Sequence, residues 1–263
     1  MIDEATVEKI VSAVVSALQD ESGGRLPPLH AIDTSTTPAR IAIGRAGPRL
    51  KTQTYLTFRA DHAVARDAVL QDVPQDLLDK LQLPTFKTKC NDKNEFLTRP
   101  DLGRQLDEQT LRALKQLNPT PCDALIYAAD GLSSRAVMAN LEDILPILLD
   151  GLAQQNIKAG KPFFLQYGRV GSMDAIAPAL QAKVVCVLLG ERPGLGSAES
   201  MSAYVAYEPT QGMPEARRTV ISNIYAGGLN AVEAGAYLAE LIAKIFREKK
   251  SGVEFNEQLT MNN

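Results

Sequence analysis

The sequence predicts an α/β protein with a helical N-terminal part and a C-terminal domain built on a parallel sheet. Three short apolar runs carry this prediction, and they read DALIYAAD, KPFFLQYG and KVVCVLLG within residues 123–190. An amphipathic stretch over residues 135–155 separates the first two runs, and the helical segment SMDAIAPALQ separates the last two. Strands that alternate with helices in this way are typical of parallel βαβ units.

Two further elements complete the C-terminal domain. The segment AYVAYEP over residues 203–209 predicts another strand, and residues 231–250 predict a long closing helix. We therefore assign residues 121–263 to a Rossmann-like α/β domain.

The N-terminal part divides into three segments. Residues 1–19 place apolar side chains on one face of an amphipathic helix, and residues 20–39 are a linker rich in Gly, Pro, Ser and Thr. Residues 40–120 predict a mainly helical domain, in which Pro100 suits a first helical turn. A helix on a linker either docks on its own protein or acts on a partner, and both readings stay open.

Composition narrows the classes of function. The 263 residues carry a net charge of −3, so there is no electrostatic signature of nucleic-acid or anionic-membrane binding. The three cysteines show no metal-binding spacing, which indicates buried free thiols in a reducing compartment. No apolar run reaches the length of a membrane span and no secretory signal is visible, so we expect a soluble, cytoplasmic protein.

Polar, turn-forming loops follow the three apolar runs, and they read ADGLSSRA, YGRVGSMD and GERPGLGSAES. Because parallel strands end at one edge of a sheet, we expect these loops to converge on one ligand crevice. Asp130 either contacts the ligand or forms an Asx turn or helix cap with Ser133. Glu191 and Arg192 either contact the ligand or form a solvated surface pair, and the flanking glycines allow close backbone approach.

The usual catalytic motifs are absent from the sequence. It contains neither a G-x-x-x-x-G-K-[ST] phosphate loop nor a G-x-S-x-G nucleophile elbow. His30 and His62 are the two histidines, which leaves no recognisable triad or zinc site. We therefore predict no catalytic residue and no metal ligand in this chain, and interpret it as a ligand-holding module.

The same segments resemble the small (light) subunit of ethanolamine ammonia-lyase, an adenosylcobalamin enzyme. The combination of LTRPDLGR and GERPGLG in this order is highly specific. The similar segments span roughly residues 40–230 and read GRAGPR, ADHAVARDAV, NDKNEFLTRPDLGRQL, ADGLSSRA, PFFLQYGRV, LLGERPGLGSAESMSAY and ISNIYAGG. The alternative is a stand-alone nucleotide-binding protein or structural partner protein that uses the same crevice.

The resemblance implies an assembly that converts ethanolamine to acetaldehyde and ammonia by a radical mechanism. A large subunit with a TIM barrel would bind the amino alcohol, and this chain would be active only together with it. The small subunit would cover adenosylcobalamin at the subunit interface, with the cofactor base-on. The D-x-H-x-x-G motif of base-off proteins is absent, since Ala60 stands two residues before His62.

The resemblance also implies which residues contact the cofactor and where in the cell the protein lies. The family's cobalamin contacts fall on Val170, Glu191 and Val220, and the last of these positions is usually cysteine in the family. Residues 1–19 are similar to the peptides that bring enzymes into a bacterial microcompartment. The chain would then lie in the cytoplasm or inside such a compartment, next to its shell.

Overall fold

A computed structural model of the protein describes residues 43–255. The helix expected over residues 1–19 and the linker over residues 20–39 lie outside these residues. The chain forms two compact units that divide after Arg59, and each is considered by itself.

The described part of the first unit is a small hairpin followed by a helix. Strands β1 (Arg45–Ala46) and β2 (Arg49–Leu50) pair antiparallel, and Gly47 takes a φ of 60° in the turn between them. A positive φ suits a residue without a Cβ. Helix α2 (Thr52–Leu70) begins after the hairpin and runs across the division between the units.

The second unit is a six-stranded sheet with helices on both faces. Its strands are β3 (Thr85–Lys87), β4 (Ala124–Ala129), β5 (Phe163–Gln166), β6 (Val184–Gly190), β7 (Met201–Tyr207) and β8 (Thr219–Ile224). Its α-helices are α3 (Gln75–Lys80), α4 (Lys93–Thr98), α5 (Glu108–Leu117), α6 (Ser134–Gln154), α7 (Met173–Leu180) and α8 (Ala231–Glu248). Three short 3₁₀ turns lie between them, η2 (Leu102–Arg104), η3 (Val170–Ser172) and η4 (Glu215–Arg217).

The strand order is β3-β5-β4-β6-β7-β8, and the predicted α/β class is confirmed. The first four strands in this order are parallel, whereas β7 and β8 are antiparallel to their neighbours. The sheet is therefore mostly parallel, as expected, and β7 is the strand that runs opposite to the others. Residues 191–200 form a loop without a helix, so β7 turns straight back along β6, as antiparallel strands do.

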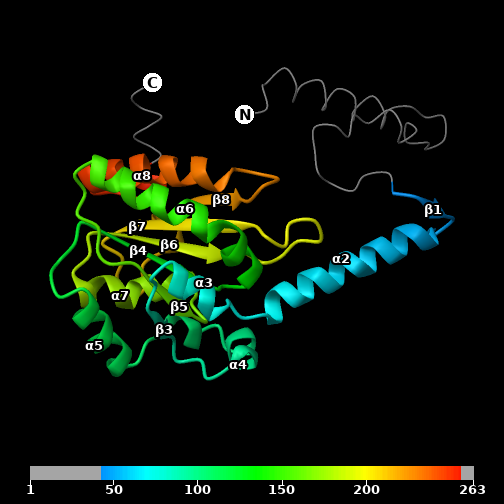
Figure 1. Ribbon diagram of the computed structural model, residues 1–263, viewed down its shortest axis with the longest axis horizontal. Coiled ribbons are helices and arrows are strands. Elements are labelled where there is room, and N and C mark those ends of the chain that lie inside the picture. Colours follow the sequence, from blue (N-terminus) through cyan, green and yellow to red (C-terminus); the bar gives the residue numbers. More distant parts are fainter. Residues whose placement is uncertain (1–42, 256–263) are drawn as a thin grey trace, which may run out of the picture. The chain divides into compact units, whose positions relative to one another are not determined.

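Two apolar cores fill the space on either side of the sheet. Helices α6 and α8 cover one face, and α5 and α7 cover the other (Figure 1). Every residue of β4 and β6 is buried, which explains their continuous apolar sequences: both faces of these strands are covered. None of the helices within residues 43–255 is long and apolar enough to cross a membrane.

The segment expected to be a mainly helical domain contributes a strand to this sheet. β3 pairs in parallel with β5, and residues 60–120 belong to the same compact unit as the strands that follow. The domain boundary expected at residue 120 falls within this unit, between α5 and β4, and stays a prediction. A strand of three residues is too short to produce a readable alternation pattern.

Candidate functional site

The sheet has a switch point between β4 and β6. The chain leaves β4 through α6 to reach β5 on one side, then crosses through α7 to β6 on the other side of β4. The two crossover helices lie on opposite faces, as the separate cores show. In such sheets the loops after the two diverging strands leave a crevice in which ligands bind.

Two glycines allow the loops after β4 and β6 to pack closely. The backbone nitrogen of Leu132 donates to the carbonyl of Gly190 at 2.9 Å. A Cβ on Gly190 would lie 2.1 Å from the Ser133 carbonyl oxygen, and Gly131 combines a φ of 55° with the same crowding. These positions accept only glycine without a shift of the backbone.

The three loops predicted to converge meet in one cavity of about 280 Å³. Its lining residues come from the ends of β4, β5 and β6, from β7, and from the 3₁₀ turns η2 and η4. They are Arg104, Gly131, Leu132, Arg169, Val170, Gly171, Leu189, Gly190, Glu191, Arg192, Tyr204 and Glu215.

Glu191 is the first residue after β6, and its carboxylate is held by Tyr204. The Tyr204 hydroxyl donates to Glu191 Oε1 at 2.8 Å. Burial, together with this bond to a carboxylate, raises the pKa of Tyr204 far above its usual range, so the hydroxyl stays a donor. Glu191 and Arg192 form no ion pair with one another within the described structure, so the expected alternative of a surface pair is wrong.

Val170 and Glu191 share the cavity, whereas Val220 lies beside it. Val170 opens η3 and packs against the core under α7. Val220 lies on β8 directly opposite Tyr204, so the two side chains project from the same face of the sheet. Val220 is 43% exposed, which makes it one of the large apolar side chains that the chain leaves uncovered.

Asp130 does not form the helix cap that was one of its two expected roles. Ser133 caps α6 instead, since its Oγ accepts from the backbone nitrogen of Ala136 at 3.2 Å. The Asp130 carboxylate is buried, and its Oδ2 lies 3.3 Å from Lys93 Nζ. Burial raises the pKa of Asp130 to about 6, against the opposing effect of Lys93. Asp130 directly follows β4 and does not line the cavity.

The cavity can supply a carboxylate acceptor, guanidinium donors and apolar contacts. It offers Glu191 at one side, three arginines, and the side chains of Leu132, Val170 and Leu189. This combination suits a large ligand with both polar and apolar groups.

Comparison with known proteins gives the same family as the motifs. A family model for the ethanolamine ammonia-lyase light chain (EutC) matches residues 29–256. A small subunit of ethanolamine ammonia-lyase from Clostridium tetani is 54% identical over 218 residues, covering 83% of this chain and 74% of the relative. The small subunit from Listeria innocua is 52% identical over the same shares of the two chains. The one from Clostridium perfringens is 45% identical over 96% of this chain and 92% of its own length.

The chain belongs to the ethanolamine ammonia-lyase light-chain family. It is therefore one subunit of a lyase complex, and its counterpart is a large subunit.

In this light chain, the structure adds residues to the cavity that sequence reasoning missed. Arg104 reaches it from η2, and Tyr204 reaches it from β7. The signal for Arg104 was present in the family motif LTRPDLGR, which ends on this residue. Tyr204 likewise ends a family segment, LLGERPGLGSAESMSAY, but its place beside Glu191 depends on β7 running antiparallel to β6.

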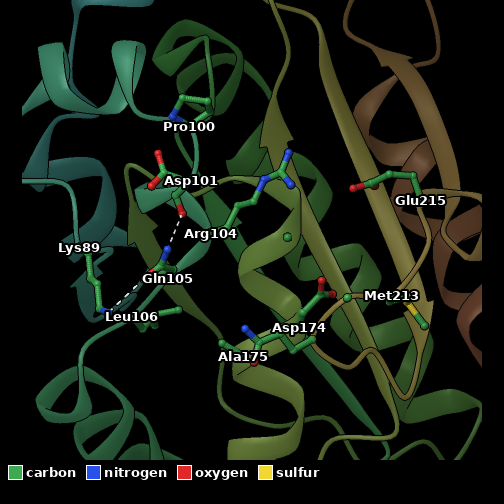
Figure 2. A pocket seen from close by; sticks show the side chains of 13 residues that line it. Lys89, Pro100, Asp101, Arg104, Gln105, Leu106, Asp174, Ala175, Met213 and Glu215 are labelled. Carbon is green, nitrogen blue, oxygen red and sulfur yellow. Dashed lines mark hydrogen bonds between the residues drawn. The ribbon is translucent and has the colours of Figure 1, made fainter.

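A larger cavity of about 680 Å³ adjoins the first and shares Arg104, Gly171 and Glu215 with it. Figure 2 shows Arg104 pointing toward Glu215 across the hollow, with Asp101 and Gln105 on one side of it and Asp174 below. Arg218 does not line this cavity; it is buried and donates from Nη2 to both oxygens of Asp174 at 2.8 Å. Burial raises the pKa of Asp174, and the Arg218 bond opposes this.

Proposed function

We propose that this chain is the small subunit of an adenosylcobalamin-dependent ethanolamine ammonia-lyase. The complex would convert ethanolamine to acetaldehyde and ammonia by a radical mechanism and would be active only with the large subunit present. This chain's part is to hold the cobalamin at the subunit interface through Val170, Glu191 and Val220. The observation that carries the proposal is the meeting of Val170 and Glu191 in one switch-point cavity, in a chain of this family.

The cavity fits part of such a cofactor. Its volume of about 280 Å³ is just below the roughly 300–1,000 Å³ of pockets that hold drug-sized ligands, and a corrinoid is larger than these ligands. This chain would therefore touch one side of the cofactor and leave the rest to the large subunit. The exposure of Val220 supports this arrangement, since a partner and cofactor would cover it.

Each contact residue has a distinct role in the proposal. Glu191 would accept hydrogen bonds from the amide side chains on the rim of the corrin, with Tyr204 fixing its orientation. Val170 and Val220 would make apolar contacts. When bound, the cofactor supplies the radical chemistry, and this chain orients it and excludes water.

The cofactor is proposed to bind base-on, with its own dimethylbenzimidazole on cobalt. The observation that supports this is that His62 is exposed on α2 and lacks the surrounding base-off motif. In the Co(II) state, nitrogen splitting of the electron paramagnetic resonance signal tests it. Labelling both subunits with ¹⁵N should leave the splitting unchanged, whereas a changed splitting would identify a protein ligand and contradict the base-on state.

Reconstitution tests the function as a whole. The purified chain and large subunit, mixed with adenosylcobalamin, should co-elute with a corrinoid absorption band and deaminate ethanolamine. The isolated chain should show no turnover, because it has no recognisable substrate-binding acid and base. Turnover by the isolated chain would contradict the proposal. A colourless complex, with a chain whose thermal stability rises with nucleotide, would favour a nucleotide-binding protein instead.

The proposed location rests on the sequence of residues 1–19, in which apolar residues recur at helical spacing ahead of a segment rich in Gly, Pro, Ser and Thr. We propose that this segment brings the enzyme from the cytoplasm to a microcompartment shell. Deleting it should leave the rate of the reconstituted complex nearly unchanged and abolish co-sedimentation with shell proteins. A large loss of rate would show that the segment docks on the catalytic body.

A further inference from the structure

Three cationic side chains gather at the switch-point cavity without the partners that arginines usually have. They are Arg104 from η2, Arg169 after β5 and Arg192 after β6. Within residues 43–255, none of the three forms an ion pair with a carboxylate. The whole chain carries a net charge of −3, so this cluster does not reflect a generally basic surface.

The carboxylates at the cavity already have other partners. Glu191 accepts from Tyr204, and Glu215 pairs with Arg218 at 2.5 Å. Arg218 is also held by Asp174. The lining residues and their direct ion-pair partners therefore comprise four guanidinium groups and three carboxylates. These groups together carry a formal net charge of +1, which one singly charged anion would neutralise.

Arg104 and Arg169 are placed to share such an anion. The aliphatic part of Arg104 passes over Gly171, where an added Cβ would come within 3.1 Å of its Cδ. Its guanidinium end points into the hollow where the two cavities join (Figure 2). Arg169 is anchored by a bond from Nη2 to the Phe96 carbonyl at 2.9 Å, and its guanidinium lies 4.2 Å from the centre of the Phe96 ring.

The two arginines also repel each other, which is a cost in the absence of an anion. Desolvation lowers the pKa of Arg169 most, and the nearby charge of Arg104 lowers it further. Its Nε is buried without a hydrogen-bond acceptor in the described part of the chain. A phosphate oxygen between the two groups would remove the repulsion, and the planar fork of arginine matches phosphate geometry.

We infer that Arg104 and Arg169 bind a phosphate group of the ligand in this cavity. The inference rests on the proposed function, since a cobalamin carries one phosphodiester in the nucleotide tail that hangs below its corrin ring. The phosphate would fix the tail in the cavity, while Glu191 contacts the ring amides. Arg104 and Arg169 are thus ligand-binding residues additional to Val170, Glu191 and Val220.

Three corrinoids that differ in this tail provide the test. Cobalamin has phosphate and base, cobinamide phosphate has the phosphate alone, and cobinamide has neither. Affinities are measured by equilibrium dialysis of the reconstituted complex, with assembly checked by size-exclusion chromatography. Arg104→Gln should weaken cobalamin and cobinamide phosphate about 10-fold, the typical effect of losing one bond to a charged group. Cobinamide should bind as tightly to Arg104→Gln as to the wild type.

The control is Arg112→Gln, because Arg112 lies on the exposed face of α5 and pairs with Glu108. It should leave all three affinities unchanged. Equal weakening of all three ligands by Arg104→Gln, or no weakening of any, would overturn the inference. Failure of the Arg104→Gln chain to assemble with the large subunit in the absence of any corrinoid would also overturn it. That result would mean that the arginines bind an acidic side chain of the large subunit. A wild-type complex that binds none of the three corrinoids would instead overturn the proposed function.

Discussion

Tyr204 on β7 holds the carboxylate of Glu191 at the end of β6, with 2.8 Å between Tyr204 Oη and Glu191 Oε1. Glu191 is the first residue of the loop over residues 191–200, and Tyr204 lies on the strand that follows this loop. A bond from the Glu191 nitrogen to the Ser200 carbonyl at 3.1 Å also closes the loop. The side-chain bond keeps one oxygen of the carboxylate occupied and leaves the other, Oε2, for a ligand. A glutamate in a mobile loop would lose more conformational entropy on binding.

This geometry predicts a graded effect of changes at Glu191. Glu191→Ala should weaken cobalamin binding by the reconstituted complex about 5- to 150-fold. This corresponds to about 1–3 kcal/mol, the cost of leaving hydrogen-bond donors of the cofactor without an acceptor. Glu191→Gln keeps an acceptor oxygen and should lose less. Tyr204→Phe should fall between Glu191→Gln and the wild type, since it removes only the support. Affinity is measured by equilibrium dialysis.

Glu199→Ala is the matched control for these variants. Glu199 lies in the same loop and pairs with Arg135 at 3.2 Å, but it does not line the cavity. An exposed ion pair contributes about 0–1 kcal/mol to stability, so both the fold and the affinity should be nearly unchanged. Wild-type affinity in Glu191→Ala, with intact assembly, would place the cofactor elsewhere.

Substitutions of Val220 test whether the exposed side of β8, next to Tyr204, faces the cofactor. The side chain is already 43% exposed, so Val220→Arg should fold with close to normal stability as an isolated chain. In the complex, the arginine should impair cobalamin binding, because it overpacks a confined space and buries a charge. Val220→Cys should be nearly silent, since the two side chains are similar in size. Normal cofactor affinity in Val220→Arg would show that the position does not face the cofactor.

The sequence predicted the central strands and missed the outer ones for a physical reason. β4 and β6 are buried on both faces, so their sequences are continuously apolar and easy to read. β8 mixes Thr, Ser and Asn with apolar residues because one of its faces is largely exposed. The strand-end loops were predictable from parallel topology, whereas Val170 within them was named only through the family resemblance. Arg104 stands in the family motif LTRPDLGR, but its place in the cavity was not predictable, because only tertiary packing brings η2 there.

The buried carboxyl of Asp130 predicts a dependence of stability on pH. Burial raises its pKa from the ordinary 3.8 of an aspartate to about 6, so the folded chain binds the proton more tightly than the unfolded chain does. This contribution is fully present below pH 4 and is lost as the pH rises through 6. The loss is at most about 2–3 kcal/mol, since one pKa unit corresponds to 1.36 kcal/mol.

Urea unfolding of wild type and Asp130→Asn between pH 4 and 7.5 measures this contribution. Asparagine does not titrate here, so the difference in free energy of unfolding between the two proteins isolates Asp130. Relative to Asp130→Asn, the wild type should become less stable as the pH rises from 4 to 6.5. A constant difference across this range would mean that Lys93, 3.3 Å away, keeps the carboxylate charged throughout.

Gly190 is predicted to control how closely the loops after β4 and β6 can pack. In Gly190→Ala the new Cβ would meet the carbonyl oxygens of Ser133 and Asp130 at 2.1 and 2.4 Å, and both belong to backbone that cannot rotate away. Overpacking of this kind costs about 1–3 kcal/mol of stability, and the displaced loops should also weaken cobalamin binding. Gly44→Ala is the control, since its Cβ would meet only the flexible side chain of Lys51. Thermal unfolding and equilibrium dialysis follow the two effects separately. Loss of stability with unchanged affinity in Gly190→Ala would mean that the cofactor does not depend on the geometry of the switch point.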